Sequence, residues 1–257
     1  MSYSFRIISC FIAFIVLNNA LIGQYDPDND VVTITKYHLK SISEVENGSS
    51  EERKDLFEEY AKKVNPLSTK LKTSMVLAHY WTGSSQDVLE FNQWNSLADA
   101  DETVVNTGDI RKRAWRRDDV REEFMKKYNS YWTMQHDDLE VMELLKDFTK
   151  KRRRKPKENT VVTVVRRYLA PLSQVENGSA EERKELWNEW FENVTMNNDK
   201  LLSQMVLRHY WSGSLSPRDG TPMVFVREWA SLADADDGGF GEPIEVFWPD
   251  EEKRKER

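Results

Sequence analysis

The chain has 257 residues, which is enough for one large domain or two domains of roughly 110–120 residues. Hydrophobic residues make up 39% and charged residues 32%, and nine Trp, nine Tyr and eleven Phe recur along the chain. This composition excludes a disordered protein. The formal net charge of −7 argues against a dedicated nucleic-acid-binding protein, because such domains are normally basic.

Residues 1–23 have the layout of a secretory signal peptide. Arg6 supplies the positive start, and 7–17 is an uncharged apolar run that is too short to span a membrane. We expect cleavage after Gly23 and an extracytoplasmic protein, periplasmic or secreted, with no membrane association afterwards. The single cysteine, Cys10, lies in the apolar run, so the mature chain would contain no disulfide and no thiol nucleophile.

An internal repeat organises the remainder of the chain. Residues 31–84 align without gaps to 161–214, and half of the aligned positions are identical, including the strings VENGS, EERK and HYW. After a short insertion, the string SLADAD occurs in both copies, at 96–101 and 231–236. Such a match indicates that a gene segment was duplicated.

We therefore predict a first unit at 31–148, a basic linker at 149–160 and a second unit at 161–257. The linker contains the run KKRRRKPK, which could bind an anionic lipid, a polysaccharide or a nucleic acid. Because the run lies between the units of an acidic chain, a solvated linker is favoured and no nucleic-acid partner is predicted.

Each unit is predicted to contain strands and helices in a fixed order. In the first unit these are a strand at 31–39, a helix from Ser49 to about Asn65, a strand at 74–81, a strand at 88–94, a helix at 109–132 and a weak strand at 138–145. Capping-box spacing opens the first helix of each copy at Ser49 with Glu52 and at Ser179 with Glu182. The apolar face of that helix repeats every four residues: Leu56, Tyr60 and Val64 in the first copy, and Leu186, Trp190 and Val194 in the second.

The βαββαβ order predicts an α+β, ferredoxin-like unit with helices on one face of an antiparallel sheet. The strand at 74–81 is apolar on both faces, so its second face also requires cover. We predict that the two tandem units pack sheet to sheet as an intramolecular pseudo-dimeric α+β barrel. The second unit is expected to be truncated at Arg257, because nothing answers 124–145, and to expose a strand edge and part of an apolar helix face.

The succession of strand, NGS-x-EER helix, HYW-x-GS hairpin and SLADAD resembles exported bacterial tandem-repeat proteins of the dimeric α+β barrel superfamily. That superfamily includes antibiotic-biosynthesis-type monooxygenases and haem-degrading relatives. The resemblance covers most of 31–257 and implies the fold. The catalytic sets of those enzymes, such as an Asn/Trp/His set or a proximal haem histidine on a helix, have no counterpart that can be placed in this sequence.

Two histidines, His79 and His209, occupy equivalent strand positions. They could line a central cavity as ligands or acid–base groups. A structural role within the sheet is favoured, because no cysteine, third histidine or HxxE spacing completes a metal set. We accordingly predict no metal site.

Three tryptophan pairs recur at 81/211, 94/229 and 115/248. They could form a pocket for a flat ligand, although aromatic residues at strand and helix spacing more often form the core. The candidate ligand-binding residues are His79, Trp81, Trp94, His209, Trp211 and Trp229. The acidic residues of SLADAD lack the glycine and distal glutamate of a calcium loop and indicate the first turn of a helix.

These observations favour a non-catalytic or small-ligand-binding barrel that holds a small apolar or aromatic molecule and no cofactor. The alternative is a cofactor-independent monooxygenase or a haem-oxidising enzyme that acts in the cavity between the repeats. No Gly-x-Ser-x-Gly, Walker or dinucleotide-binding motif is present. An enzyme would require a formed pocket with convergent polar groups, and the sequence leaves that point and the oligomeric state open.

Overall fold

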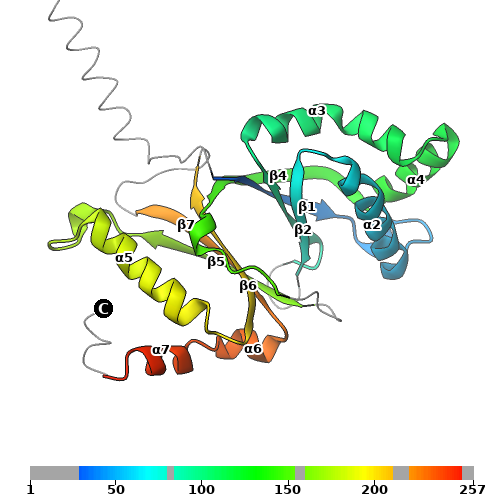
Figure 1. Cartoon of the computed structure of the whole chain (residues 1–257). Coiled ribbons are helices and arrows are strands. Elements are labelled where there is room, and N and C mark those ends of the chain that lie inside the picture. Colours follow the sequence, from blue (N-terminus) through cyan, green and yellow to red (C-terminus); the bar gives the residue numbers. More distant parts are fainter. Residues whose placement is uncertain (1–28, 80–83, 154–159, 211–219, 251–257) are drawn as a thin grey trace, which may run out of the picture.

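The structure is a computed structural model that describes residues 29–79, 84–153, 160–210 and 220–250 (Figure 1). The predicted signal peptide lies outside these ranges, as do two of the candidate ligand-binding residues, Trp81 and Trp211. We refer to 29–153 as the N-terminal half and to 160–250 as the C-terminal half.

The elements follow one another in a similar order in both halves. The N-terminal half contains β1 (Val31–Leu39), α2 (Ser50–Val64), β2 (Leu71–Ala78), β3 (Asp87–Trp94), α3 (Leu97–Ala114), α4 (Asp118–Ser130) and β4 (Trp132–Leu144). The C-terminal half contains β5 (Val161–Leu169), α5 (Ala180–Trp190), a π-helical turn (Phe191–Thr195), β6 (Leu201–His209), β7 (Thr221–Trp229), α6 (Leu232–Asp237) and α7 (Gly241–Phe247). Among the described helices, none has both the length and the apolar character needed to cross a membrane.

All seven strands belong to one antiparallel sheet, in the order β2-β3-β1-β4-β6-β7-β5. The halves meet where Met142, Glu143 and Leu144 of β4 pair with β6. The prediction of two separate sheets packed face to face thus requires correction, because the halves join edge to edge. The physical reason is that β4 has a second edge, and pairing with β6 satisfies its backbone groups.

One face of this sheet carries a hydrophobic cluster to which both halves contribute. Its buried members are Val32, Ile34, Phe91, Met142, Leu144, Leu207, Val224 and Val226. An ion pair between Arg166 of β5 and Glu140 of β4 also connects strands that are not neighbours in the sheet. The sheet therefore curves, so that this face becomes the inner face of the molecule.

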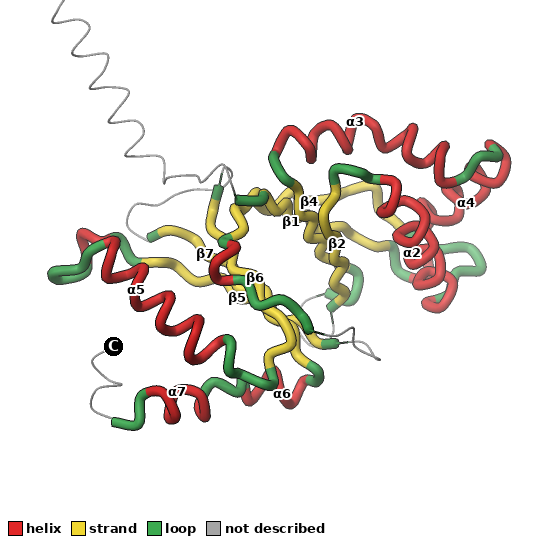
Figure 2. The backbone as a smooth tube through the Cα atoms, in the orientation of Figure 1, coloured by secondary structure: helices red, strands yellow, loops and turns green. Residues whose placement is uncertain are grey.

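The helices lie on the outer face (Figure 2). In the N-terminal half, α2, α3 and α4 enclose a second cluster, whose buried members are Leu56, Val64, Ile110, Trp115, Phe124 and Tyr131. The predicted single helix at 109–132 is in fact parts of two helices, interrupted at Trp115–Arg117, and the predicted weak strand begins earlier, at Trp132. The SLADAD string forms the first turn of a helix, as its acidic residues indicate, and the side chain of Ser96 accepts a hydrogen bond from the Asp99 amide at 3.2 Å. The helix that it starts, α3, begins at Leu97, earlier than the predicted 109.

Candidate functional site

The start of α2 shows how the N-terminal half covers the outer face of its sheet. Ser49 Oγ accepts a hydrogen bond from the Glu52 amide at 3.0 Å, as the capping-box spacing predicts. The second half of the box is replaced by Tyr131, whose hydroxyl accepts from the Ser49 amide at 3.0 Å and donates to Glu52 at 2.6 Å. Lys127 adds an ion pair to Glu52 at 2.7 Å. These contacts bind the end of α4 to the start of α2.

Aromatic stacking closes the rest of this helix face. Phe57 of α2 stacks on Trp132 with ring centroids 4.6 Å apart, and Tyr60 stacks on Tyr128 at 4.7 Å. The apolar face of α2 is thus covered by α4 and the first residue of β4, and Leu56 is only 8% exposed.

In the C-terminal half, α5 begins in the same way, with Ser179 Oγ accepting from the Glu182 amide at 3.0 Å. The apolar face of α5, however, is not covered in the same way as that of α2. The described residues of this half stop at Asp250, which corresponds to Arg117, the residue before α4. No described segment takes the place of α4 and β4, and Leu186 and Trp190 are 38% and 40% exposed.

A cavity of about 570 Å³ occupies this space. It lies between α5 and the outer face of β5, β6 and β7. Its lining comprises Phe148, Val165, Arg167, Leu172, Val175, Glu176, Gly178, Ser179, Glu182, Arg183, Leu186, Trp187, Trp190, Phe191, Thr195, Gln204, Val206, Phe225 and Arg227. A cavity of this size and composition is suited to an aromatic ligand group.

Two arginines form the polar part of the sheet wall. The Nε of Arg227 donates to Gln204 Oε1 at 2.8 Å, and the guanidinium lies 5.0 Å from the ring centroid of Phe225. Burial, and then the neighbouring charge of Arg167, lowers the pKa of Arg227, although an arginine remains a cation at neutral pH. Within the described ranges, the side chain of Arg167 makes no hydrogen bond or ion pair. The wall therefore offers positive charge beside aromatic rings.

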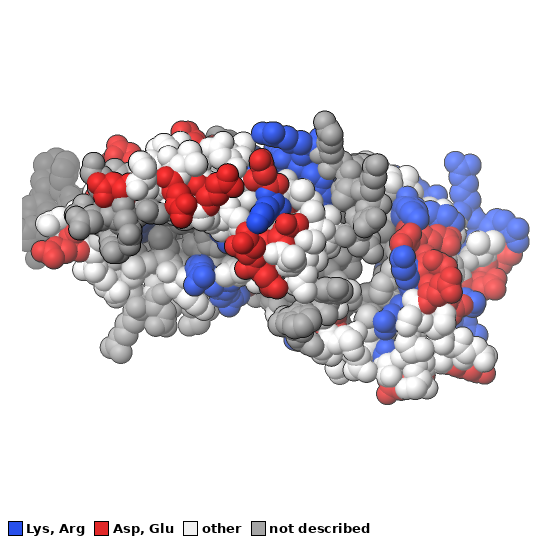
Figure 3. Space-filling model, turned by 90° about the horizontal axis from the view of Figure 1, so that it is seen from below, with Lys and Arg blue, Asp and Glu red and all other residues white. Residues whose placement is uncertain are grey.

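Around the remainder of the visible surface the charges are mixed. Figure 3 shows acidic and basic side chains interspersed over one face, with neither sign covering it. Among the described residues drawn on this face, the basic side chains form no continuous positive surface of the kind that nucleic acids require.

Two of the predicted ligand-binding residues, Trp94 and Trp229, are core residues on the outer face of the sheet. They are 5% and 2% exposed. Their indole Nε1 groups donate to equivalent threonines, Thr33 at 3.1 Å and Thr163 at 3.0 Å. The indole nitrogens are thus already satisfied by hydrogen bonds within the protein.

His209 points to the other face. It lies at every second position of β6 with Met205 and Leu207, on the same face, and these two residues pack in or against the inner-face cluster. The sheet therefore separates His209 from Trp94 and Trp229. Burial, together with the positive charge of Arg166, lowers the pKa of His209. His79 lies just after the end of β2. The described residues of the predicted set therefore do not form a single site.

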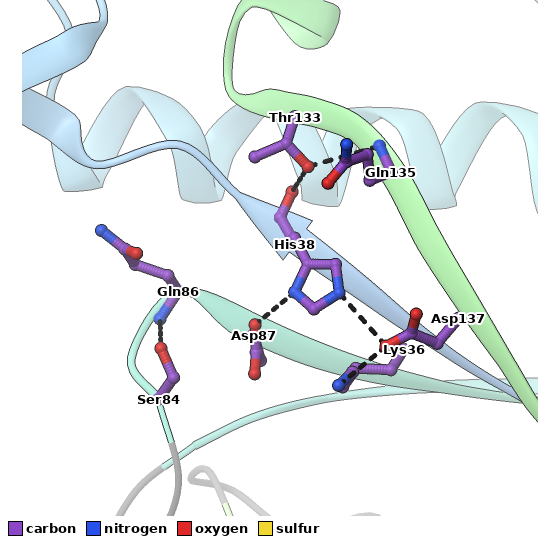
Figure 4. A network of polar contacts seen from close by, with 8 residues as sticks. All are labelled: Lys36, His38, Ser84, Gln86, Asp87, Thr133, Gln135 and Asp137. Carbon is purple, nitrogen blue, oxygen red and sulfur yellow. Dashed lines mark hydrogen bonds and ion pairs between the residues drawn. The ribbon is translucent and has the colours of Figure 1, made fainter.

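His38 lies at the centre of a polar network that was not predicted from the sequence (Figure 4). Its ring nitrogens contact Asp87 at 2.7 Å and Asp137 at 3.3 Å, and Lys36 pairs with Asp137 at 2.8 Å. The network joins β1, β3 and β4. Because both ring nitrogens contact carboxylates from neighbouring strands, the network links the three strands through side chains. The repeat comparison gave no signal, since Tyr168 replaces this histidine in the second copy.

A metal site is not evident in the described ranges, which contain no group of three or more His, Cys, Asp or Glu side chains able to hold an ion. A catalytic metal usually requires at least three protein ligands.

Comparison with known proteins gives remote likenesses only. The chain matches no protein-family model, and no curated protein matches it. Similar solved structures include a proposed monooxygenase from Fusobacterium nucleatum (9% identity, 86% of this chain and 85% of that chain, TM-score 0.46). A chlorite dismutase from Candidatus Nitrospira defluvii is 9% identical over 89% of this chain and 86% of that chain, with a TM-score of 0.45. A dimeric protein of unknown function with a ferredoxin-like fold, from Bacteroides fragilis, covers 47% of this chain and 99% of its own, at 10% identity and a TM-score of 0.29.

Proposed function

We propose that this protein is a non-catalytic binding protein and that the cavity beside α5 holds an apolar, aromatic ligand group. One observation carries the proposal: the helix face that Tyr128 and Trp132 cover in the N-terminal half is open in the C-terminal half. A contiguous open apolar surface beside a formed cavity commonly marks a binding site.

The lining indicates which ligand chemistry suits the cavity. Trp187 and Phe225 provide flat apolar walls, while Arg167 and Arg227 provide positive charge on the sheet side. A ligand with an aromatic body and an acidic group would stack on the rings and pair with a guanidinium.

We also propose that the two halves form a pseudo-dimeric α+β barrel of tandem ferredoxin-like units. The β4–β6 pairing, the inner cluster shared by both halves and the ion pair of Arg166 with Glu140 support this arrangement. In this proposal the cavity lies outside the barrel, on the outer face of the C-terminal half.

Export is a further part of the proposal, and it rests on the signal-like sequence at 1–23. If the full gene is expressed in a secreting host, we expect the extracytoplasmic protein to begin at Gln24. N-terminal sequencing checks this, and an intact Met1 terminus in the extracytoplasmic fraction would contradict cleavage.

A fluorescence titration with anilinonaphthalene sulfonate tests the binding function, because the probe has a flat apolar body and an anionic group. We expect saturable binding to the folded protein that weakens about tenfold in Trp187→Ala, which removes a stacking wall. Arg167→Gln, an exposed change, should weaken binding severalfold. The matched control is Val105→Ala, because Val105 is 82% exposed on the other half.

Circular dichroism should show that each variant remains folded, since unfolded or molten chains also bind this probe. Equal affinity in all of the variants would contradict the proposed site.

A further inference from the structure

The strand beside the cavity has an open edge. β5 pairs only with β7, so β5 and β2 are the two edge strands of the sheet. Its counterpart in the N-terminal half, β1, lies between β3 and β4. The described structure therefore leaves the backbone groups along one edge of β5 without a neighbouring strand, directly beside the opening over α5.

We propose that the cavity and this edge together bind a polypeptide segment consisting of a helix followed by a strand, with the chemistry of 118–144. The inference rests on the proposed function, because the aromatic side chains of the segment would be the ligand group that the cavity holds. The N-terminal half supplies a template for each contact.

The polar part of the template is centred on a glutamate in the first turn of the helix. In α2, Glu52 accepts a hydrogen bond from the Tyr131 hydroxyl at 2.6 Å and forms an ion pair with Lys127 at 2.7 Å. Glu182 occupies the same position in α5, lines the cavity and forms no side-chain hydrogen bond with another described residue. A tyrosine and a lysine from the incoming helix would complete this arrangement.

The apolar part of the template is the aromatic stack. Phe57 and Tyr60 of α2 stack on Trp132 and Tyr128. Trp187 and Trp190 occupy their positions in α5 and both line the cavity. Indoles offer larger stacking surfaces than the side chains they replace. The incoming segment should present two aromatic residues four positions apart, one in its helix and one at the start of its strand, as Tyr128 and Trp132 do.

The charge on β5 favours an acidic strand at its edge. In the N-terminal half, Lys36 of β1 lies opposite Asp137 of β4 and pairs with it at 2.8 Å. The equivalent position of β5 is Arg166, which already pairs with Glu140 of β4, so the positive charge that faces the cavity beside the open edge is that of Arg167. A strand with an aspartate near this position, like β4, would be complementary to Arg167.

A synthetic peptide of residues 118–144, added to the full-length chain, provides the test. Fluorescence anisotropy should show binding in the micromolar range, because part of the interaction free energy is spent in ordering the peptide. Hydrogen exchange should become slower in β5. Glu182→Gln, an exposed change, should weaken binding about tenfold through loss of two charge-assisted hydrogen bonds.

The matched control is Glu185→Gln, which changes an exposed glutamate of the same helix that does not line the cavity and should leave the affinity unchanged. A peptide with Tyr131→Phe should bind more weakly to the unchanged protein than the original peptide does, and its sensitivity to Glu182→Gln should be smaller, because only the lysine contact remains.

Absence of peptide binding at about 100 µM would overturn the inference. So would protection of β1 in place of β5, which would mean that the peptide only exchanges with the chain's own α4 and β4. If anilinonaphthalene sulfonate binds and the peptide does not, the proposed function stands and the inference falls; if neither binds, both fall.

Discussion

Among single residues, Glu90 is a carboxyl group that is largely buried beside the aromatic side chains of the N-terminal half. Glu90 lies on β3 near the hydroxyl of Tyr37. Burial is the largest influence and raises the pKa of Glu90, while hydrogen bonds from Tyr37 and Asn92 act in the opposite direction. The folded state therefore favours the protonated carboxyl.

The sign of the pH dependence follows from this shift. A carboxyl whose pKa is higher in the folded than in the unfolded state stabilises the fold at low pH, and that contribution is lost as the pH rises from its ordinary value of 4.5 through the folded value. Glu90→Gln should therefore raise the free energy of unfolding at pH 7 and have little effect near pH 4. Urea denaturation at both pH values measures this, with Glu123→Gln as the exposed control; a variant equally destabilised at both would contradict it.

Residue-level signals also explain which parts of the site the sequence could predict. Ser49 and Ser179 each cap a helix over three residues, so local spacing was enough to find them. Tyr131 could not be predicted to complete the cap of α2, because it lies 82 positions from Ser49. The His38 network similarly joins residues from three strands.

At the scale of elements, the junction between the halves depends on a few residues of β4 and β6. Glu143 is 1% exposed, and it accepts a hydrogen bond from Arg208 Nε at 2.8 Å across this junction. Strand pairing at this distance in the chain depends on tertiary packing, which is why the sequence suggested two facing sheets and not one continuous sheet.

Arg208→Ala should lower the free energy of unfolding by about 2–3 kcal/mol, because a buried carboxylate loses its charged partner. Chemical denaturation measures this loss. Lys112→Ala breaks an exposed ion pair with Asp109 and should cost less than about 1 kcal/mol. Losses of similar size in the two variants would show that the junction does not depend on the Arg208 contact.

At the scale of the whole molecule, the inner face of the sheet bears on the enzymatic alternative. Met142 and Leu207 are fully buried on that face, and His209 follows Leu207 on the same side of β6. Side chains fill the centre of this face, whereas the cavity lies on the opposite one.

We therefore expect that added haem will give no stoichiometric Soret shift and that quinol-type substrates will support no oxygen uptake. Absorbance titration and an oxygen electrode check both expectations. A Soret shift that is lost in His209→Ala would instead support the haem-oxidising alternative.

The outer face of the C-terminal half is open beside α5, whereas Trp94 and Trp229 of the sheet are buried. Oxidative labelling with mass spectrometry measures this difference directly, residue by residue. We expect rapid labelling of Trp190, slow labelling of Trp94 and Trp229, and protection of Trp190 when anilinonaphthalene sulfonate is bound. Labelling of Trp190 as slow as that of Trp229 in the free protein would show that this face is closed.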